Sequence, residues 1–366
     1  MNSHKVTFYP IGNADTTLIE PQQGLKILFD YANMRCLDDD EDKRVDLPAE
    51  LNKSVIGDYD IVCFTHCDDD HVHRFSEYFY LEHATKYQCK DRKKIKQLWV
   101  PAAVLLDPDC DDDAKILRAE ARYRLRNKKG ILVFSRPDKM KDWCDCQEDI
   151  DYESVKHLFV DAGKLVPGLT KAEHGIEFFV HSPFASTTEN IDRNKEAITV
   201  QAVFDDVSES KLILGSDIDH CVWMDIVKVT RRFGNSNRLL WDIFHVSHHC
   251  SYTALGPDKG SDETEPVSEV KWLFETQGRK SPRIISPSWC IPTVDTTQPP
   301  HKQAASYYKR VAYTKSGEFL VTMEEPSKVG PKPLQIEINH FTGAKVVRSV
   351  ALGTAFVSDK KPPKAG

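Results

Sequence analysis

The sequence predicts an α/β fold, a sandwich of two mixed β-sheets with helices on its outer faces. Short apolar runs typical of buried strands recur along the whole chain, and amphipathic segments separate some of them. Strands and helices do not alternate strictly, which favours mixed sheets over a purely parallel one. The composition of 366 residues, 40% hydrophobic and 29% charged, fits a folded chain of this class.

The N-terminal half opens with strands. Residues 6–20 read as two short strands joined by a Gly-Asn turn, and a third strand at 26–30 ends in an acid. A polar loop with a short helix is expected at 33–54. The later elements expected in this half are a strand at 61–65, a helix at 74–90, a strand at 98–100, a helix at 111–129 and a strand at 131–134.

The C-terminal half is richer in strands. An irregular, charged segment at 138–170 precedes it, and a helix is expected at 223–233. The expected strands are 176–181, 197–204, 211–214, 240–246, 283–286, 318–323 and 334–339. We assign residues 1–355 to one domain, with an insertion at about 86–175, and residues 356–366 to a disordered tail.

The strongest functional signal is the run Thr-His-Cys-Asp-Asp-Asp-His-Val-His at residues 65–73. Carboxylates crowded this closely repel one another, and a bound cation offsets that repulsion. Other acidic triplets, at 38–40 and 111–113, lack flanking histidines, so we interpret them as ordinary surface. The interleaved His-x-Asp-x-Asp-His predicts a metal site, and nitrogen and carboxylate ligands suit zinc, manganese or iron. The candidate ligands in this loop are His66, Asp68, Asp70 and His71.

Further candidate ligands stand at the ends of later strands. His181 ends one expected strand, Asp217 closely follows another, and His248 and His249 follow a third. A lone histidine after a strand is more often structural, but strand ends that supply His, Asp and His-His in turn favour a shared site. A carboxylate such as Asp217 can bridge two cations about 3.5 to 4 Å apart.

These motifs resemble those of the metallo-β-lactamase superfamily of metal-dependent hydrolases, and most closely the hydrolase domain of competence DNA-uptake proteins. The likeness spans roughly residues 6–325 and rests on the order of its elements. The matching elements are His66 to His71, Gly12 to Asp15 with Asp30, His181-Ser182-Pro183, Gly215-Ser216-Asp217, His248 to Ser251 and Pro300-His301. The motifs also depart from the family pattern, with Val72-His73 for the usual Gly-Gly, Cys250 for a glycine and Ser216 inserted before Asp217. None of these departures removes a proposed ligand, but the first changes the pocket.

The resemblance implies an αββα metallo-β-lactamase sandwich that binds two divalent ions, zinc foremost and manganese as its competitor. It implies this ligand set: His66, Asp68 and His181 on one ion, Asp70, His71 and either His248 or His249 on the other, and Asp217 between them. Catalytic roles would fall to Asp70, His249 and His301. Asp30 would accept an N–H from a ligand histidine, and His73 and His220 are lesser candidates.

The expected function is hydrolysis of phosphodiester bonds in a nucleic acid or nucleotide. The net charge of −7 argues mildly against a long DNA track, while basic runs at 90–96 and 118–129 offer either solvated faces or phosphate contacts. One alternative is a hydrolase of small esters, lactones or thioesters. Another is a metal-stabilised interaction module whose insertion binds a protein partner.

The expected location is the cytoplasm, without a membrane contact. No apolar stretch approaches the roughly 18 to 20 residues that cross a bilayer, and the N-terminus lacks a signal-peptide core. We therefore expect most of the ten cysteines to be reduced.

Overall fold

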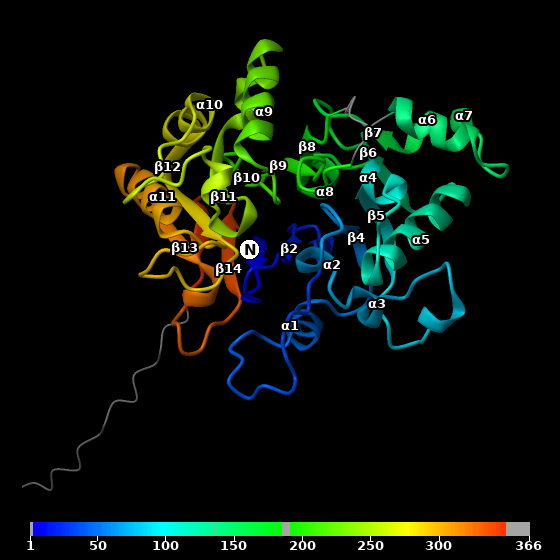
Figure 1. Cartoon of the computed structure of the whole chain (residues 1–366), viewed down its shortest axis with the longest axis horizontal. Coiled ribbons are helices and arrows are strands. Elements are labelled where there is room, and N and C mark those ends of the chain that lie inside the picture. The colour runs from blue at the N-terminus through cyan, green and yellow to red at the C-terminus, as the bar shows by residue number, and fades with distance from the viewer. Residues whose placement is uncertain (1–2, 136, 185–190, 349–366) are drawn as a thin grey trace, which may run out of the picture.

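Two β-sheets pack face to face between two layers of helices in the computed structural model of this chain (Figure 1). The structure describes residues 3–135, 137–184 and 191–348. The predicted αββα sandwich of two mixed sheets is confirmed. The expected tail at 356–366 lies outside the described residues.

The first sheet has the order β15-β14-β1-β2-β3-β4-β5-β6-β7. Its strands are β1 (His4–Phe8), β2 (Thr17–Glu20), β3 (Ile27–Phe29), β4 (Tyr59–Cys63), β5 (Ile95–Pro101), β6 (Ile131–Phe134), β7 (Phe159–Val160), β14 (Leu334–Asn339) and β15 (Gly343–Val346). Pairing is antiparallel from β15 to β3 and parallel from β3 to β7. Three strands of the expected insertion, β5 to β7, therefore extend this sheet.

The second sheet has the order β13-β12-β11-β10-β9-β8. Its strands are β8 (Ile176–Ser182), β9 (Thr199–Phe204), β10 (Lys211–Leu214), β11 (Trp241–His245), β12 (Gly278–Ser286) and β13 (Glu318–Val321). Pairing is antiparallel from β8 to β10 and parallel from β10 to β13. Both sheets thus place parallel strands beside antiparallel ones.

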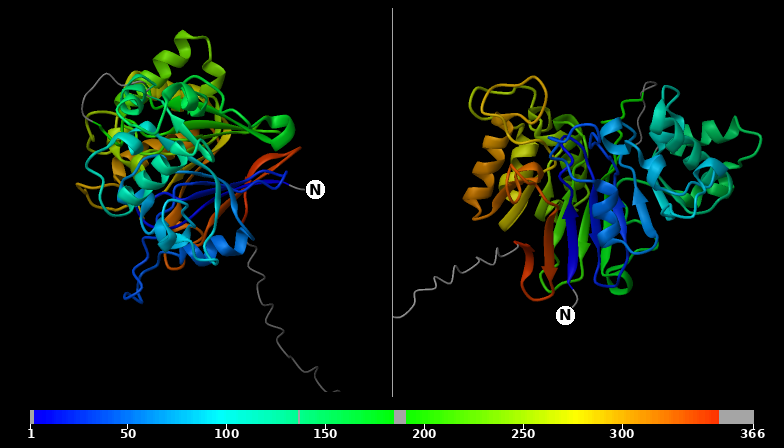
Figure 2. Two further views of the ribbon diagram at one scale, coloured as in Figure 1. Left: turned by 90° about the vertical axis from the view of Figure 1, so that its right-hand side faces the viewer. Right: turned by 90° about the horizontal axis from the view of Figure 1, so that it is seen from below.

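Helices cover the outer face of each sheet (Figures 1 and 2). Those on the side of the first sheet are α1 (Leu47–Ser54), α2 (Asp69–Val72), α3 (Phe75–Tyr78), α4 (Ala102–Leu106), α5 (Asp112–Arg126), α6 (Pro137–Asp145) and α7 (Tyr152–Val155). Those over the second sheet are α9 (His220–Arg232), α10 (Ser268–Trp272) and α11 (Lys302–Thr314), while α8 (Lys171–His174) precedes β8. No helix in the described ranges is long and apolar enough to cross a membrane.

Strand periodicity explains the three apolar layers. In β3, Ile27 and Phe29 face the core between the sheets, whereas Leu28 faces the helices. Phe29 and Phe178 bring the two sheets together, with ring centroids 5.7 Å apart, and Trp99 packs edge-on against both. Central strands that are buried on both faces have continuous apolar sequences, and this is why they could be predicted from the sequence.

The predicted helix at 74–90 is wrong over most of its length. Only α3 and a single turn at Thr85–Tyr87 are helical. Phe79 is extended and pairs with Lys93, and the backbone N–H of Tyr80 donates to the Lys93 carbonyl oxygen. Phe79 and Leu81 are fully buried, so tertiary packing of this aromatic run overrides its helical propensity.

Candidate metal centre

The carboxyl ends of four strands deliver the candidate ligands to one edge of the sandwich. Asp30 follows β3 and the 66–71 loop follows β4, while Asp217 follows β10 and His249 follows β11. β3 is parallel to β4 and β10 is parallel to β11, so each pair of loops leaves its sheet at the same end. Face-to-face packing then brings the two pairs together.

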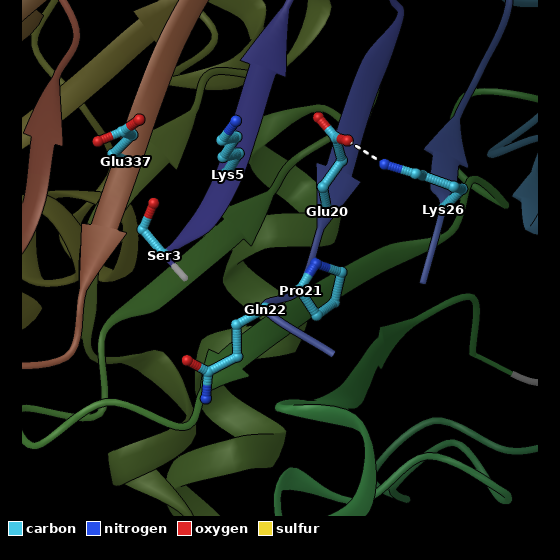
Figure 3. Close-up of a pocket in the computed structure, with 7 residues that line it drawn as sticks. All are labelled: Ser3, Lys5, Glu20, Pro21, Gln22, Lys26 and Glu337. Carbon is cyan, nitrogen blue, oxygen red and sulfur yellow. Dashed lines mark hydrogen bonds and ion pairs between the residues drawn. The ribbon is translucent and has the colours of Figure 1, made fainter. Parts of the chain in front are cut away.

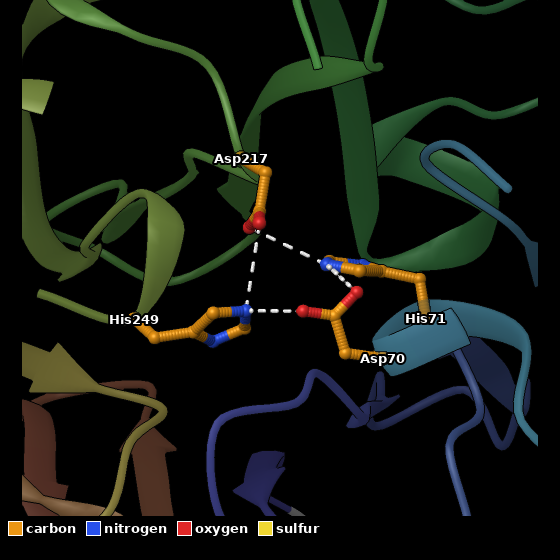
Figure 4. A group of neighbouring side chains, drawn as sticks. All are labelled: Asp70, His71, Asp217 and His249. Carbon is orange, nitrogen blue, oxygen red and sulfur yellow. Dashed lines mark hydrogen bonds and ion pairs between the residues drawn. The ribbon is translucent and has the colours of Figure 1, made fainter. Parts of the chain in front are cut away.

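Four side chains converge at this edge: Asp70, His71, Asp217 and His249 (Figure 4). Each offers one ligand atom, and these atoms all lie within 4.8 Å of one another. His249 Nε2 lies 3.0 Å from Asp70 Oδ2 and 3.4 Å from Asp217 Oδ2, and His71 Nε2 lies 3.3 Å from Asp217 Oδ1. The Asp70 side chain is 30% exposed and the other three are buried, so the cluster opens to solvent beside Asp70.

Asp30 fixes the ring of His71. Its Oδ2 accepts the His71 Nδ1–H at 2.9 Å and the Thr65 hydroxyl at 2.7 Å, and its Oδ1 accepts the Thr65 backbone N–H at 2.7 Å. This carboxylate is 2% exposed. With Nδ1 carrying the proton, Nε2 points at the cluster, so the expected role of Asp30 as acceptor matches the geometry.

A strained turn presents His249. His248, His249 and Cys250 all have left-handed backbone angles, with φ of 51°, 51° and 66°, although none is glycine. His249 Nδ1 donates to the Pro287 carbonyl oxygen at 2.9 Å, which turns Nε2 towards Asp70. The His248 ring stands perpendicular to it, with centroids 6.1 Å apart. Of the two histidines that the sequence left open, the structure places His249 in the cluster.

Close packing of backbone fixes Asp217. A Cβ at Gly215 would lie 2.5 Å from Ser247 Oγ and 2.9 Å from the His245 carbonyl oxygen, so glycine lets β10 and β11 approach here. Ser216 has a φ of 46°, and its hydroxyl donates to Thr65 Oγ1 at 2.8 Å. This hydrogen bond ties the Asp217 turn of the second sheet to the ligand loop of the first.

Opposite charges dominate the electrostatics of the cluster. Burial alone would lower the pKa of His71, but Asp30, Asp217 and Asp70 together raise it well above the usual value. Burial would likewise lower the pKa of His249, but Asp217 and Asp70 raise it well above its usual value. Burial would raise the pKa of Asp217, yet His249 and His71 hold it well below its usual range. Protons on the two histidines thus balance the carboxylates in the metal-free state.

Orphaned polar atoms indicate that a cation fits here. His66 Nε2, His71 Nε2 and Asp217 Oδ1 are among the buried polar atoms of the described residues that lack a well-formed hydrogen bond, although the last two form an ion pair at 3.3 Å. Burying such atoms without a partner costs free energy, and all three could donate a lone pair to a bound divalent ion. Two imidazoles with two carboxylates form a donor set that zinc and manganese both accept. The residues present therefore fit a metal ion.

His66 and Asp68, which were expected to bind a second ion, form a less complete group of ligands. The rings of His66 and His71 lie 3.9 Å apart by centroid, and His66 Nε2 is 3.7 Å from Asp68 Oδ2. The other oxygen of Asp68 accepts from Arg193 Nη1 at 3.1 Å, and Arg193 Nε donates to Asp107 Oδ2 at 2.7 Å. No sequence pattern marked Arg193, because its position beside Asp68 depends on contacts between segments that lie far apart in the chain.

The structure corrects the expectation for His181. Its Nε2 donates to the Arg238 carbonyl oxygen at 2.9 Å, and its ring packs edge-on against Phe179. Because Phe178 and Val180 point into the core between the sheets, strand alternation turns His181 to the opposite face. Burial lowers the pKa of His181 to about 4. The cluster of Asp70, His71, Asp217 and His249 does not include it.

His301 also lies apart from this cluster. Its Nδ1 accepts the Tyr252 backbone N–H at 3.3 Å and its Nε2 donates to the Thr297 carbonyl oxygen at 3.3 Å. Both ring nitrogens thus hold the start of α11, and the expected catalytic role receives no geometric support. The lesser candidates are engaged elsewhere: His73 pairs with Asp69, and His220 hydrogen bonds the Thr253 carbonyl oxygen.

Two buried groups behind His249 escaped the sequence analysis as site residues. Asp15 Oδ1 lies 3.5 Å from His245 Nε2 and 3.8 Å from His249 Nδ1. Burial raises the pKa of Asp15 to about 8 and lowers that of His245 to about 3. The Gly-Asn-Ala-Asp turn was a signal for Asp15. Nothing distinguished His245 from a core histidine in an apolar strand.

A hollow of about 470 Å³ lies at the other ends of these strands, away from the candidate metal centre (Figure 3). Lys26 precedes β3 and Glu20 ends β2, and these two residues form an ion pair there. The hollow holds no histidine and lies away from the ends that carry Asp30 and the 66–71 loop. Size alone therefore does not identify the site. Its lining residues are Ser3, Lys5, Glu20, Pro21, Gln22, Lys26 and Glu337.

Several arginines of the basic run at 118–129 contact neighbouring parts of the chain. Arg118 and Arg122 on α5 donate to the carbonyl oxygens of Asp107 and Leu105. Arg124 pairs with the buried Glu120. These contacts favour a structural role over phosphate binding for the run.

Comparison with known proteins adds little. No family model and no curated protein matches this chain. A protein from Parabacteroides distasonis assigned as a metal-dependent hydrolase is 11% identical, with a TM-score of 0.36 over 87% of this chain and 93% of that one. Zn²⁺-bound PqqB from Methylobacterium extorquens is 9% identical, with a TM-score of 0.39 over 83% of this chain and 84% of that one. Likenesses this weak carry no argument about function.

Proposed function

We propose that this protein is a metal-dependent hydrolase of the metallo-β-lactamase superfamily that cleaves phosphodiester bonds in a nucleic acid or nucleotide. The observation that carries the proposal is the convergence of Asp70, His71, Asp217 and His249 from two sheets onto one solvent-facing point. Groups with perturbed pKa values that face solvent at the ends of strands are candidates for a catalytic site.

The proposed centre is dinuclear, with unequal sites. The four-residue cluster would hold the tighter ion, zinc first and manganese as the alternative. His66 and Asp68 would hold a second ion and share Asp217 with the first. We expect this second ion to bind more weakly, because His181 does not complete its ligands and Arg193 competes for Asp68.

Each residue has a separate task in the proposed reaction. Bound divalent ions would lower the pKa of a water molecule and neutralise charge that develops on a phosphoryl oxygen. Asp70 is the most exposed acid of the cluster, and it would orient that water or take its proton. Asp30 and the Pro287 carbonyl oxygen hold the two histidine rings, so that their Nε2 atoms face the centre.

Arg193 favours an anionic substrate over a neutral ester or lactone. Its side chain is 25% exposed at the mouth of the site, and it contacts Asp68, Asp107 and the Asp109 carbonyl oxygen. A guanidinium carries more N–H donors than these three contacts use. The remaining donors could bind a phosphate oxygen, which a neutral substrate would not offer.

The test combines metal analysis with turnover. Purified protein loaded with zinc or manganese would be assayed on bis-p-nitrophenyl phosphate, single- and double-stranded DNA, RNA and a lactone panel. We expect phosphodiester cleavage that falls at least about 100-fold in Asp217→Asn and Asp70→Asn and is abolished by chelation. Asp69→Asn is the matched control, because Asp69 lies on the same loop with a side chain 68% exposed.

Each other outcome has a defined meaning. Turnover of lactones or esters without phosphodiesters would replace the proposed substrate class. Stoichiometric metal without turnover of any substrate would favour the interaction module. Equal losses in Asp69→Asn and Asp217→Asn would contradict the assignment of the site.

A further inference from the structure

Two cysteines meet beside the candidate metal centre. Cys67 stands between His66 and Asp68, and Cys110 lies in the loop between α4 and α5. Both belong to the core under the first sheet, with Cys67 2% exposed and Cys110 8% exposed. Their sulfur atoms and an oxygen of Asp107 lie within 4.8 Å of one another.

This group is poorly suited to a metal ion of its own. Asp107 Oδ1 accepts the Asp109 backbone N–H at 2.8 Å, and Asp107 Oδ2 accepts Arg193 Nε at 2.7 Å. The carboxylate is therefore already satisfied, and the guanidinium places a positive charge where a cation would approach. What remains is a pair of neighbouring free thiols.

We propose that Cys67 and Cys110 form an oxidation site, at which a peroxide converts the thiol pair into a disulfide that reversibly locks the metal-ligand loop. The two sulfur atoms lie within 4.8 Å of each other and would have to approach to about 2.05 Å to form the bond. Cys110 is the thiol that a small oxidant reaches first, since it is the more exposed of the two.

The environment divides the chemical roles between the two thiols. Cys110 is 8% exposed and Cys67 2%, so Cys110 reacts with the peroxide and Cys67 takes part only in the second step. The Cys110 thiolate attacks one peroxide oxygen, the O–O bond breaks, and sulfenic acid and water form. Cys67 sulfur then attacks Cys110 sulfur, and the S–O bond breaks to release a second water. Two thiols lose two protons and two electrons in total, and the peroxide is reduced to two waters.

The disulfide would act on the metal ligands through chain geometry. Cys67 has His66 on one side and Asp68 on the other, so drawing its sulfur towards Cys110 displaces both. Arg193 already joins Asp68 to Asp107 across the same gap. This consequence rests on the proposed function, whereas formation of the disulfide does not.

Mass spectrometry of the full-length protein tests the oxidation site. Reduced protein would be treated with hydrogen peroxide, alkylated, weighed intact and digested with trypsin. We expect the loss of two hydrogens and a cross-link between the peptides 54–74 and 97–115, both reversed by dithiothreitol. Cys67→Ser and Cys110→Ser should lose the cross-link. Cys63→Ala is the matched control, because Cys63 shares the first peptide but faces the other core.

The opposing results are equally clear. Full alkylation of both cysteines after peroxide treatment, or oxidation of Cys110 to sulfinic acid without a cross-link, would overturn the proposal. Calorimetry then compares manganese binding by the reduced and disulfide forms, and we expect the weaker ion to bind about 10-fold less tightly in the latter. Equal affinities would overturn the locking role. Absence of metal binding in both forms would count against the proposed function alone.

Discussion

Neighbouring histidines after β11 have different environments, and this difference is testable one residue at a time. His249 is buried with its Nε2 in the cluster, whereas His248 is partly exposed and its ring is perpendicular to that of His249. We expect His249→Ala to weaken binding of the tighter ion at least about 100-fold and His248→Ala to change it little. Competition with a coloured chelator measures both. Equal effects of the two substitutions would contradict the choice of His249.

Asp30 is expected to act on the metal only through His71. In Asp30→Asn, the amide oxygen can replace either Oδ2, which accepts from His71 Nδ1 and the Thr65 hydroxyl, or Oδ1, which accepts from the Thr65 backbone N–H, but not both. The expected result is a loss of about 10- to 100-fold in metal affinity, measured by the same competition. Thr65→Ser keeps the hydroxyl and should bind metal like the wild type. An unchanged affinity in Asp30→Asn would exclude this role.

Arg193 is expected to bind substrate rather than to activate water. We predict that Arg193→Gln raises KM for a phosphodiester about 10-fold with a smaller change in kcat, because the lost contacts act on the bound anion. Lys195→Gln removes the same charge two residues away, at a side chain that is 52% exposed, and should leave KM nearly unchanged. Steady-state kinetics of both variants measures the two constants. A fall in kcat alone would place Arg193 in the chemical step instead.

At the scale of elements, the approach of β10 to β11 depends on Gly215. Gly215→Ala would force a Cβ to within 3.0 Å of Ser247 Oγ and the His245 carbonyl oxygen. We expect a loss of about 1 to 3 kcal/mol in the free energy of unfolding, measured by urea denaturation. Gly330→Ala is the control, because its Cβ would meet no atom within 4 Å. Comparable stability of the two variants would show that the turn can relax.

Element boundaries show where sequence patterns succeed. The strand at 211–214 matches β10, which is buried along its whole length, and the strand at 334–339 matches β14, in which buried and partly buried residues alternate. The helix expected at 223–233 begins three residues earlier, where Asp219 caps it through the backbone N–H groups of Cys221 and Val222. The helix at Lys302–Thr314 was not predicted, although its buried face repeats with helical spacing.

For the whole molecule, metal binding should depend on pH. In the metal-free protein the pKa values of His71 and His249 are raised by their carboxylate neighbours. The stability from these protonated pairs is present below the unfolded pKa of about 6.5 and is lost as pH rises through the raised folded values. Because an ion must displace both protons, its apparent affinity should increase with pH.

Thermal unfolding with and without metal measures this linkage. We expect metal to raise Tm at neutral pH. At a free metal concentration of about 100 times Kd, binding should add about 2.7 kcal/mol to the free energy of unfolding. The increase in Tm caused by metal should become smaller as the pH falls. A gain independent of pH would mean that the ion does not displace the histidine protons.

Local patterns of residues determined much of this protein. Apolar runs and their spacing located the strands of both sheets, and the interleaved His-x-Asp-x-Asp-His marked the loop at 66–71. Both signals lie in short stretches of chain, where strand periodicity and like-charge crowding act between near neighbours. The fold class and the cluster residues Asp70, His71 and Asp217 followed from them.

Tertiary structure alone decided how the distant segments meet. Strand alternation in β8 turned His181 away, the left-handed turn after β11 chose His249 over His248, and a returning loop placed Arg193 beside Asp68. Each outcome depends on which face a side chain occupies after two sheets have packed. That choice is made by contacts between residues far apart in the chain, which a one-dimensional pattern does not encode.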